Sequence, residues 1–307
     1  MISLKNEYLH NQVKNIKNIY IDQSNLLLAS EISSVLNENP YQNSNEIIFK
    51  KCAYEKIHTN NKDKYIANLV YKNRYNIDLV KRGLIKHQNI PFLGDFIDGI
   101  TQDGTIINFK CLKKKQYISN KLNNLSFYRW SKIQCQLEIC ELDICDSIEC
   151  VFEEYKSENE YLSDLSKNER GVIFEYNGVI KYSPLYILGE DLYNWKKNLI
   201  EQYPNNLLSN FSYWTVKEMS CKTIYRNQEW FHKIKDKLEI FWNKVLLYKN
   251  CDMNNLKNDI QLEIDNLKNK RNNTIFMDIK NELEITKLEE IIINIESMQP
   301  NKKRKIS

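Results

Sequence analysis

Residues 92–111, FLGDFIDGITQDGTIINFKC, constrain the fold of this chain more than any other segment. Two runs with β-type alternation flank a pair formed by Asp103 and Gly104, and Asp-Gly between such runs is a strong signal for a tight turn. The segment therefore predicts a β-hairpin. Its first strand carries Asp98 and its second strand ends at Lys110.

Side chains two residues apart on a strand point to the same face. Asn108 and Lys110 are therefore expected to share one face, opposite Ile107 and Phe109, and Asp98 on the neighbouring strand is expected to reach the face of Asn108. Two carboxylates and a Lys in this pattern, D–x(n)–(D/E)-x-K, are typical of metal-dependent phosphodiester cleavage, because Mg²⁺ prefers hard oxygen ligands. Asn108 stands where the second carboxylate belongs.

Size and composition place few limits on the fold and the function of the chain. The 307 residues suffice for one large α/β domain, or for a domain with a helical appendage, and the 42% hydrophobic and 27% charged residues are ordinary for a globular protein. A net charge of +4 is compatible with a nucleic-acid ligand without requiring one. The chain has no apolar run of transmembrane length and no signal-peptide pattern. We expect an intracellular protein of the cytoplasm or nucleus.

Eight cysteines are present, four of them at a spacing of five residues: Cys135, Cys140, Cys145 and Cys150. This spacing matches neither a CxxC zinc site nor a small disulfide scaffold. Reduced thiols are expected.

The pattern of apolar residues predicts helices and strands along most of the chain. Helices are expected at residues 26–36, 44–56, 61–75, 125–142, 192–203, 228–247, 254–269 and 278–295. Strands are expected at 80–87, 90–100, 105–110 and 146–155, with a second hairpin at 171–187 around Asn177-Gly178. This order predicts an α/β fold, a mixed β-sheet flanked by helices with an added C-terminal helical region. We expect an N-terminal arm (1–19), a core domain (20–225), C-terminal helices (226–298) and a basic tail (299–307).

Five segments resemble, in order and spacing, the YqaJ-type viral recombinases, relatives of phage lambda exonuclease in the PD-(D/E)XK nuclease superfamily. They are LLLASEISSVLNENPYQNSNEIIFKK, IANLVYKNRYN, FLGDFIDGI with IINFKC, WSKIQCQLEICELDICDSIEC and EWFHKIKDKLEIFWNKV, which together cover roughly residues 20–247. The resemblance implies a restriction-endonuclease-like fold. It also implies linear duplex DNA or DNA ends as ligand, a recombination partner protein, and Mg²⁺ or Mn²⁺ as cofactor if the protein is active.

The resemblance also assigns roles to individual residues. Asp98 matches a metal-binding and catalytic position, and Lys110 matches the catalytic lysine. Ser30 matches a phosphate contact, although a serine there also suits a helix cap. Gln134 matches the family's glutamine-containing helix and is a candidate catalytic residue, with a solvated helix position as the alternative.

Four other positions depart from the family's pattern. Gln23 replaces an Arg that contacts phosphate, and Lys132 replaces the first glutamine of the helix. Lys64 replaces a metal-binding Glu, and Asn108 replaces the second metal carboxylate. An Asn carbonyl contacts a cation without contributing charge, whereas a Lys repels Mg²⁺.

Three functional hypotheses remain open on the sequence. The first is a DNA-binding viral recombination protein of this family whose hydrolytic activity is lost or weak. The second is an active, divergent Mg²⁺-dependent exonuclease, in which Asp63 is a weak candidate for the missing metal ligand; Asp103 is more suited to its turn. The third is a structural or interaction protein that uses the C-terminal helices.

Two basic clusters and two apolar patterns complete the predictions. Lys113, Lys114 and Lys115 are either a solvated loop or a phosphate-contacting lip, and the tail residues Lys302, Lys303, Arg304 and Lys305 are either a nuclear-import-like signal or a solvated end. The stripe of Trp230, Phe231, Phe241 and Trp242 is predicted to be core. The apolar residues of the last two helices predict a helical hairpin rather than an intermolecular coiled coil; they are Leu256, Ile260, Ile264, Leu267, Leu283, Leu288, Ile291, Ile292 and Ile295.

Overall fold

A computed structural model describes most of the chain. The described residues are 23–53, 62–80, 83–113, 125–203, 210–251, 253–272 and 279–298. The predicted N-terminal arm, Lys114, Lys115 and the basic tail with Lys302, Lys303, Arg304 and Lys305 lie outside these residues. Within the described residues, no helix is both long enough and apolar enough to cross a membrane.

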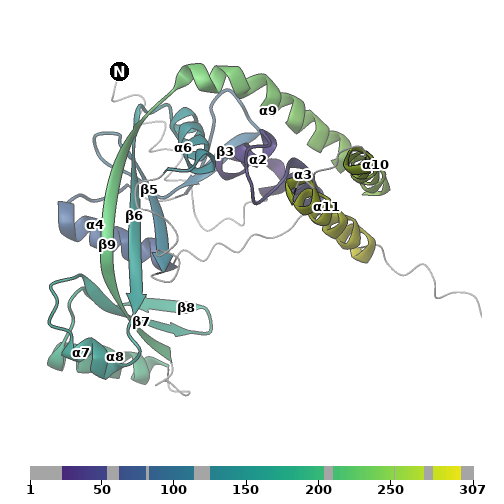
Figure 1. Cartoon of the computed structure of the whole chain (residues 1–307). Helices are drawn as coiled ribbons and strands as arrows, with labels where there is room; N and C mark the ends of the chain where they lie inside the picture. The colour runs from purple at the N-terminus through teal and green to yellow at the C-terminus, as the bar shows by residue number, and fades with distance from the viewer. Residues whose placement is uncertain are drawn as a thin grey trace, which may run out of the picture.

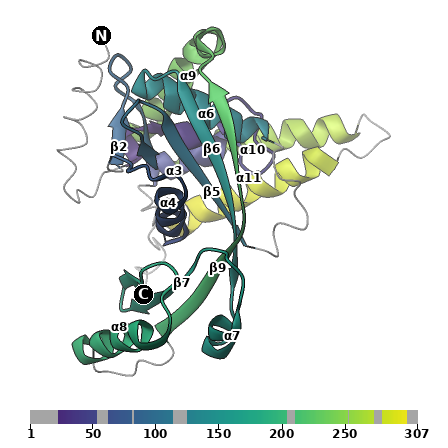
Figure 2. The same cartoon turned by 90° about the vertical axis from the view of Figure 1, so that its left-hand side faces the viewer.

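A six-stranded mixed sheet forms the centre of the molecule, in the order β4-β5-β6-β9-β7-β8. Its strands are β4 (Gly99–Ile100), β5 (Ile106–Lys113), β6 (Ile144–Glu154), β7 (Arg170–Tyr176), β8 (Val179–Tyr182) and β9 (Phe211–Tyr225). β5 and β6 are parallel, and the other neighbouring pairs are antiparallel. The long strands β6 and β9 connect the main body to an arm formed by β7, β8, α7 (Glu158–Ser163) and α8 (Gly189–Gln202) (Figures 1 and 2).

A smaller three-stranded sheet lies beside the first, in the order β1-β3-β2. Its strands are β1 (Leu27–Leu28), β2 (Gly83–Lys86) and β3 (Leu93–Ile97). The prediction of one hairpin over residues 90–110 is therefore wrong in part, because β3 pairs with β1 and β2, and only β4 pairs with β5. The strand breaks at Asp98, whose carboxylate accepts a hydrogen bond from the Phe109 backbone N–H (2.9 Å).

Helices cover both faces of the central sheet. α4 (Lys62–Tyr75) packs on the face that carries Ile107 and Phe109, and the Tyr71 and Phe109 rings meet edge to face at 6.1 Å. α6 (Phe127–Cys140) covers the opposite face, where Arg129 contacts Glu149 of β6. The predicted mixed α/β sheet flanked by helices is confirmed.

The C-terminal part is helical, as predicted. α9 (Gln228–Lys249) continues from the end of β9 over the top of the body and leads to α10 (Met253–Asn272) and α11 (Ile279–Met298) (Figure 1). α10 and α11 pack against each other and against α3 (Ser44–Cys52), which confirms the intramolecular hairpin. Six of the apolar residues predicted for this hairpin are at most 3% exposed: Leu256, Ile260, Ile264, Leu288, Ile291 and Ile295. Leu283, which was predicted with them, is 52% exposed.

Local chemistry explains several element boundaries. Asn177 and Gly178 both have positive φ (46° and 80°), as a two-residue hairpin turn requires, so the second hairpin is confirmed. α3 begins after Asn43, whose side chain accepts a hydrogen bond from the Glu46 backbone N–H and so caps the helix. At Gly99 a Cβ would lie 2.5 Å from Leu79 Cδ1, so any larger residue there requires the Leu79 side chain to move.

Other elements also differ from their predictions. Residues 26–36 were predicted as one helix, but they form β1, a 3₁₀ turn at Ala29–Glu31 and the short α2 (Ile32–Val35). Leu26, Leu27 and Leu28 are all buried, and an apolar run of this kind suits a strand enclosed on both faces. The 15-residue strand β9 had no predicted counterpart.

Candidate functional site

Asp98 lies between β3 and β4, at the edge of β5, and is buried. Its Oδ2 accepts a hydrogen bond from the Phe109 backbone N–H, and its Oδ1 accepts one from Lys64 Nζ at 2.8 Å. Lys64 comes from the first turn of α4 and its side chain is about one-third exposed. Both oxygens of the carboxylate that the resemblance matches to a metal-binding position therefore already have a donor from this chain.

Asn108 and Lys110 have their contacts on the α6 side of β5. The Asn108 amide donates from Nδ2 to Gln136 Oε1 (3.2 Å), and Lys110 Nζ lies 3.2 Å from Glu149 Oε1. Asp98 instead contacts Lys64, from the helix on the opposite face of the sheet. The described contacts of Asp98 are thus Lys64 and the Phe109 backbone N–H, whereas those of Asn108 and Lys110 come from α6 and β6.

Glu149 is buried on β6, next to Lys110 in the parallel register. Arg129 from the first turn of α6 forms an ion pair with the same carboxylate and also donates from Nη2 to the Ile148 carbonyl (3.5 Å). Burial lowers the pKa of the Arg129 guanidinium, and the charge of Glu149 opposes that shift. The Glu149 carboxylate therefore forms ion pairs with two cations, Lys110 and Arg129.

Asp95 of β3 is a second buried acid on the α6 side. Gln136 Nε2 donates to its Oδ2 at 2.7 Å, and Lys132 Nζ lies 4.0 Å away. Burial raises the pKa of the Asp95 carboxyl above its usual value. Gln136 thus connects Asn108 of β5 with Asp95 of β3.

Gln134 has a different set of contacts from Gln136. Its Nε2 donates to the Tyr225 carbonyl (2.9 Å), and its Oε1 accepts from the Asn227 backbone N–H (2.6 Å). It therefore holds the junction of β9 and α9, where Asn227 is the N-cap of α9. Gln134 was predicted as a catalytic residue, but in its described contacts it holds the backbone of Tyr225 and Asn227 in place.

Ser30 lies in the 3₁₀ turn before α2 and is exposed. Its neighbour Glu31 is buried, forms an ion pair with buried Lys51 (2.7 Å) and accepts from the Leu28 backbone N–H (2.8 Å). Burial raises the pKa of Glu31. This pair fixes the turn that presents Ser30.

Asp63, Asp103 and Lys113 lie apart from these contacts. Asp63 and Lys113 line a hollow of about 790 Å³ with Trp214 and Ile173, toward the arm. Asp103 accepts a hydrogen bond from the Thr101 hydroxyl, in the turn between β4 and β5. Asp103 thus has the local turn contact that its sequence position predicted.

The residues present do not fit a divalent cation at this edge. In the described part of the chain, no group of three or more His, Cys, Asp or Glu side chains is arranged to hold a metal. Three buried carboxylates, Asp95, Asp98 and Glu149, lie near the motif, and four cationic side chains contact them: Lys64, Lys110, Arg129 and Lys132. The chain itself therefore supplies at least one cation to each of these carboxylates.

Sequence reasoning missed Arg129, Glu149 and Gln136 as members of this cluster. Gln136 and Glu149 lie in the 130–150 segment that carries the resemblance, two residues from Gln134 and one from Cys150. A signal was present for Glu149, because it is the acid in an otherwise apolar stretch, Ile148–Phe152. Arg129 lies just before that segment, and nothing in its local pattern marks it as buried.

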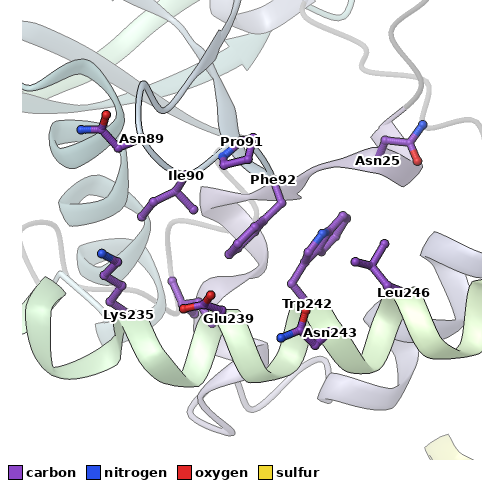
Figure 3. A pocket seen from close by; sticks show the side chains of 11 residues that line it. Asn25, Asn89, Ile90, Pro91, Phe92, Lys235, Glu239, Trp242, Asn243 and Leu246 are labelled. Carbon is purple, nitrogen blue, oxygen red and sulfur yellow. The ribbon is translucent and has the colours of Figure 1, made fainter.

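A separate hollow of about 590 Å³ lies between α9 and the loop that precedes β3 (Figure 3). The Phe92 and Trp242 rings stack there at 5.4 Å with an interplanar angle of 10°. Lys235 and Glu239 are its described charged lining residues. Since this lining provides one carboxylate, the hollow does not supply the acids missing at Asp98.

The sequence matches no protein-family model. It is 27% identical over 277 residues to the uncharacterized protein R354 of Acanthamoeba polyphaga mimivirus, a match that covers 73% of this chain. The chain spans about half (50%) of the length of that curated relative.

The fold is similar to the crystal structure of an alkaline exonuclease, LHK-Exo, from Laribacter hongkongensis, with a TM-score of 0.45 and 14% identity over 75% of this chain and 92% of that chain. The complex of LHK-Exo with dAMP gives a TM-score of 0.44, also at 14% identity, over 74% and 91% of the two chains.

Proposed function

We propose that this protein is a DNA-binding recombination protein of the YqaJ and lambda-exonuclease type whose metal-dependent hydrolysis is lost or weak. The contact between Lys64 Nζ and Asp98 Oδ1 at 2.8 Å is the observation that carries this proposal. The five sequence segments that resemble the family support the assignment of class. The nuclease-like core spans residues 20–225, and the helices of 226–298 are appended to it.

Electrostatics supports the loss of hydrolysis. A divalent cation next to Asp98 would lie beside the Lys64 ammonium, and like charges at contact distance repel strongly in a partly buried site. Asn108 adds no charge, and its amide is assigned as a donor to Gln136. The chain therefore supplies its own cation where the family's chemistry requires Mg²⁺ or Mn²⁺.

The same cations suit a phosphate ligand. Lys64 and Lys110 are about one-third exposed, whereas the carboxylates that they contact are about nine-tenths buried. The side accessible to solvent is therefore the positive one, and phosphate contacts of this kind give affinity without sequence preference. The proposed ligand is linear duplex DNA or its ends inside the host cell, with a recombination partner protein that supplies hydrolysis.

The test is incubation of end-labelled linear duplex DNA with the full chain and Mg²⁺ or Mn²⁺, beside an Asp98→Ala variant. Binding at low salt without cleavage is the expected result for the native protein. Cleavage that disappears in Asp98→Ala would overturn the loss of hydrolysis and favour the divergent exonuclease. Absence of both binding and cleavage would favour an interaction protein that uses the C-terminal helices.

A further inference from the structure

An aromatic surface lies where α6 and α9 begin. It consists of Phe127, Trp130, Tyr225 and Trp230. The Trp130 and Trp230 ring centroids are 4.9 Å apart, and Phe127 lies 5.7 Å from Trp130 and 6.4 Å from Trp230. Tyr225 ends β9 and lines the same hollow as Phe127 and Trp130.

The aromatic surface is more exposed than a packing role requires. Tyr225 is 70% exposed and Phe127 is 38% exposed, whereas Phe241 and Trp242 further along α9 are buried. The predicted core stripe thus holds for Phe231, Phe241 and Trp242, while Trp230 is half-buried. The open hollow over this surface has a volume of about 450 Å³, within the usual range of small-ligand sites.

Positive charge borders the aromatic surface. Exposed Lys222 lines the hollow, and its described lining contains no carboxylate. Lys222 also lines an adjoining polar corner with Arg129, Ser147 and Glu149. The surface is therefore continuous with the Arg129–Glu149–Lys110 contacts of the candidate site.

The start of α6 adds to this charge. α6 begins at Phe127 with no acidic residue in its first turn, so its partial positive N-terminal end lies at the aromatic surface, whereas the first turn of α9 carries Glu229. Exposed rings beside positive charge complement the two parts of a nucleotide, since a base stacks on a ring and a phosphate pairs with a cation. An apolar peptide would use the rings but not the charge.

We propose that the aromatic surface is a stacking platform for single-stranded nucleic acid. Bases stack on Tyr225 and Phe127, and the phosphate backbone passes Lys222 toward the polar corner at Arg129. This inference rests on the proposed function in taking nucleic acid as the ligand. It goes beyond that function in assigning an unpaired strand to a surface that lies outside the Asp98 motif.

The test is binding of a fluorescein-labelled oligothymidylate to the full chain at low salt, measured by fluorescence anisotropy. Tyr225→Ala is expected to weaken binding about 5- to 150-fold, the range for loss of one base–aromatic stack. Tyr225→Phe keeps the ring and is expected to bind like the native protein. Lys222→Ala is expected to weaken binding and to reduce its salt dependence.

Tyr193→Ala is the matched control, because Tyr193 is also a largely exposed tyrosine (65%) but lies on α8 in the arm. It is expected to leave binding unchanged. Urea unfolding midpoints of all variants check that each one folds.

Three results would overturn the platform: no binding of oligothymidylate by the native protein, equal affinity of Tyr225→Ala and the native protein, or equal losses in Tyr225→Ala and Tyr193→Ala. These outcomes are separable from failure of the proposed function, which is read from cleavage and binding of duplex DNA by Asp98→Ala. Stacking on Tyr225 that persists in an active nuclease would leave the platform intact.

Discussion

Asp98 and Glu149 lie on either side of β5 and are neutralised in different ways. Asp98 has one cation, the partly exposed Lys64, and one backbone donor. Glu149 has two cations, Lys110 and the buried Arg129. The difference lies in Arg129, which is buried and reaches Glu149 from the interior, whereas Lys64 and Lys110 are each about one-third exposed.

Arg129→Met is expected to have the largest effect on stability. Removing one partner of a buried ion pair costs about 3–5 kcal/mol, and we expect the lower end because Lys110 still contacts Glu149. Urea unfolding followed by circular dichroism measures the loss. The double variant Arg129→Met with Glu149→Gln should recover part of it; a single variant as stable as the native protein would contradict a structural role for this pair.

Lys64→Glu combined with Asn108→Glu is expected to create metal affinity at the Asp98 edge. The two changes remove a repelling cation and add two carboxylates, so Mn²⁺ should bind at least about tenfold more tightly than to the native protein. Isothermal titration calorimetry measures the affinity. Lys64→Gln with Asn108→Gln is the control that removes the cation without adding acids, and equal Mn²⁺ affinity of the two double variants would show that the missing carboxylates are not the cause.

Lys64→Met is expected to have a small effect on stability, which would sharpen the contrast with Arg129. Ion pairs with a partly exposed partner contribute about 0–1 kcal/mol, and Asp98 keeps its hydrogen bond from Phe109. The same urea unfolding experiment applies. A loss as large as that of Arg129→Met would place the Asp98 pair in the interior with Glu149.

Asp95→Asn is expected to change the pH dependence of stability and little else. Burial raises the pKa of Asp95 in the folded protein above its usual value of 3.8, so the folded state binds the proton more tightly than the unfolded state. The free energy of unfolding contributed by this group therefore falls as the pH rises from about 4 through the raised pKa. Across that pH range, the free energy of unfolding should fall less steeply with pH for Asp95→Asn than for the native protein. Equal slopes for the two proteins would contradict the raised pKa.

Local patterns predicted helices well and strands unevenly. α4, α9 and the C-terminal hairpin follow from apolar residues at helical spacing, and Asn177-Gly178 gives the β7–β8 turn. β9 was not predicted because polar residues interrupt its alternation from Lys217 to Thr223, and its pairing with β6 is made across distant sequence. β1 has two residues and exists only through its pairing with β3.

The candidate site was predicted in part for the same reason. Asp98, Asn108 and Lys110 were recognisable because they lie within one short segment. The cluster partners come from α6 and β6, and only packing brings Arg129 within contact of Glu149, 20 residues along the chain. Gln134 and Gln136 are two residues apart and therefore point to different sides of α6. Gln134 contacts the junction of β9 and α9, and Gln136 contacts Asp95.

The sequence by itself determined the mixed α/β class and the turns at Gly104 and Asn177-Gly178, because each depends on neighbouring residues. Tertiary structure decided which partners Lys64 and Asn108 contact. Lys64 lies 34 residues before Asp98, and it forms the ion pair because α4 packs on the Phe109 face of β5. Contacts over such distances depend on how whole elements pack, which local patterns do not encode.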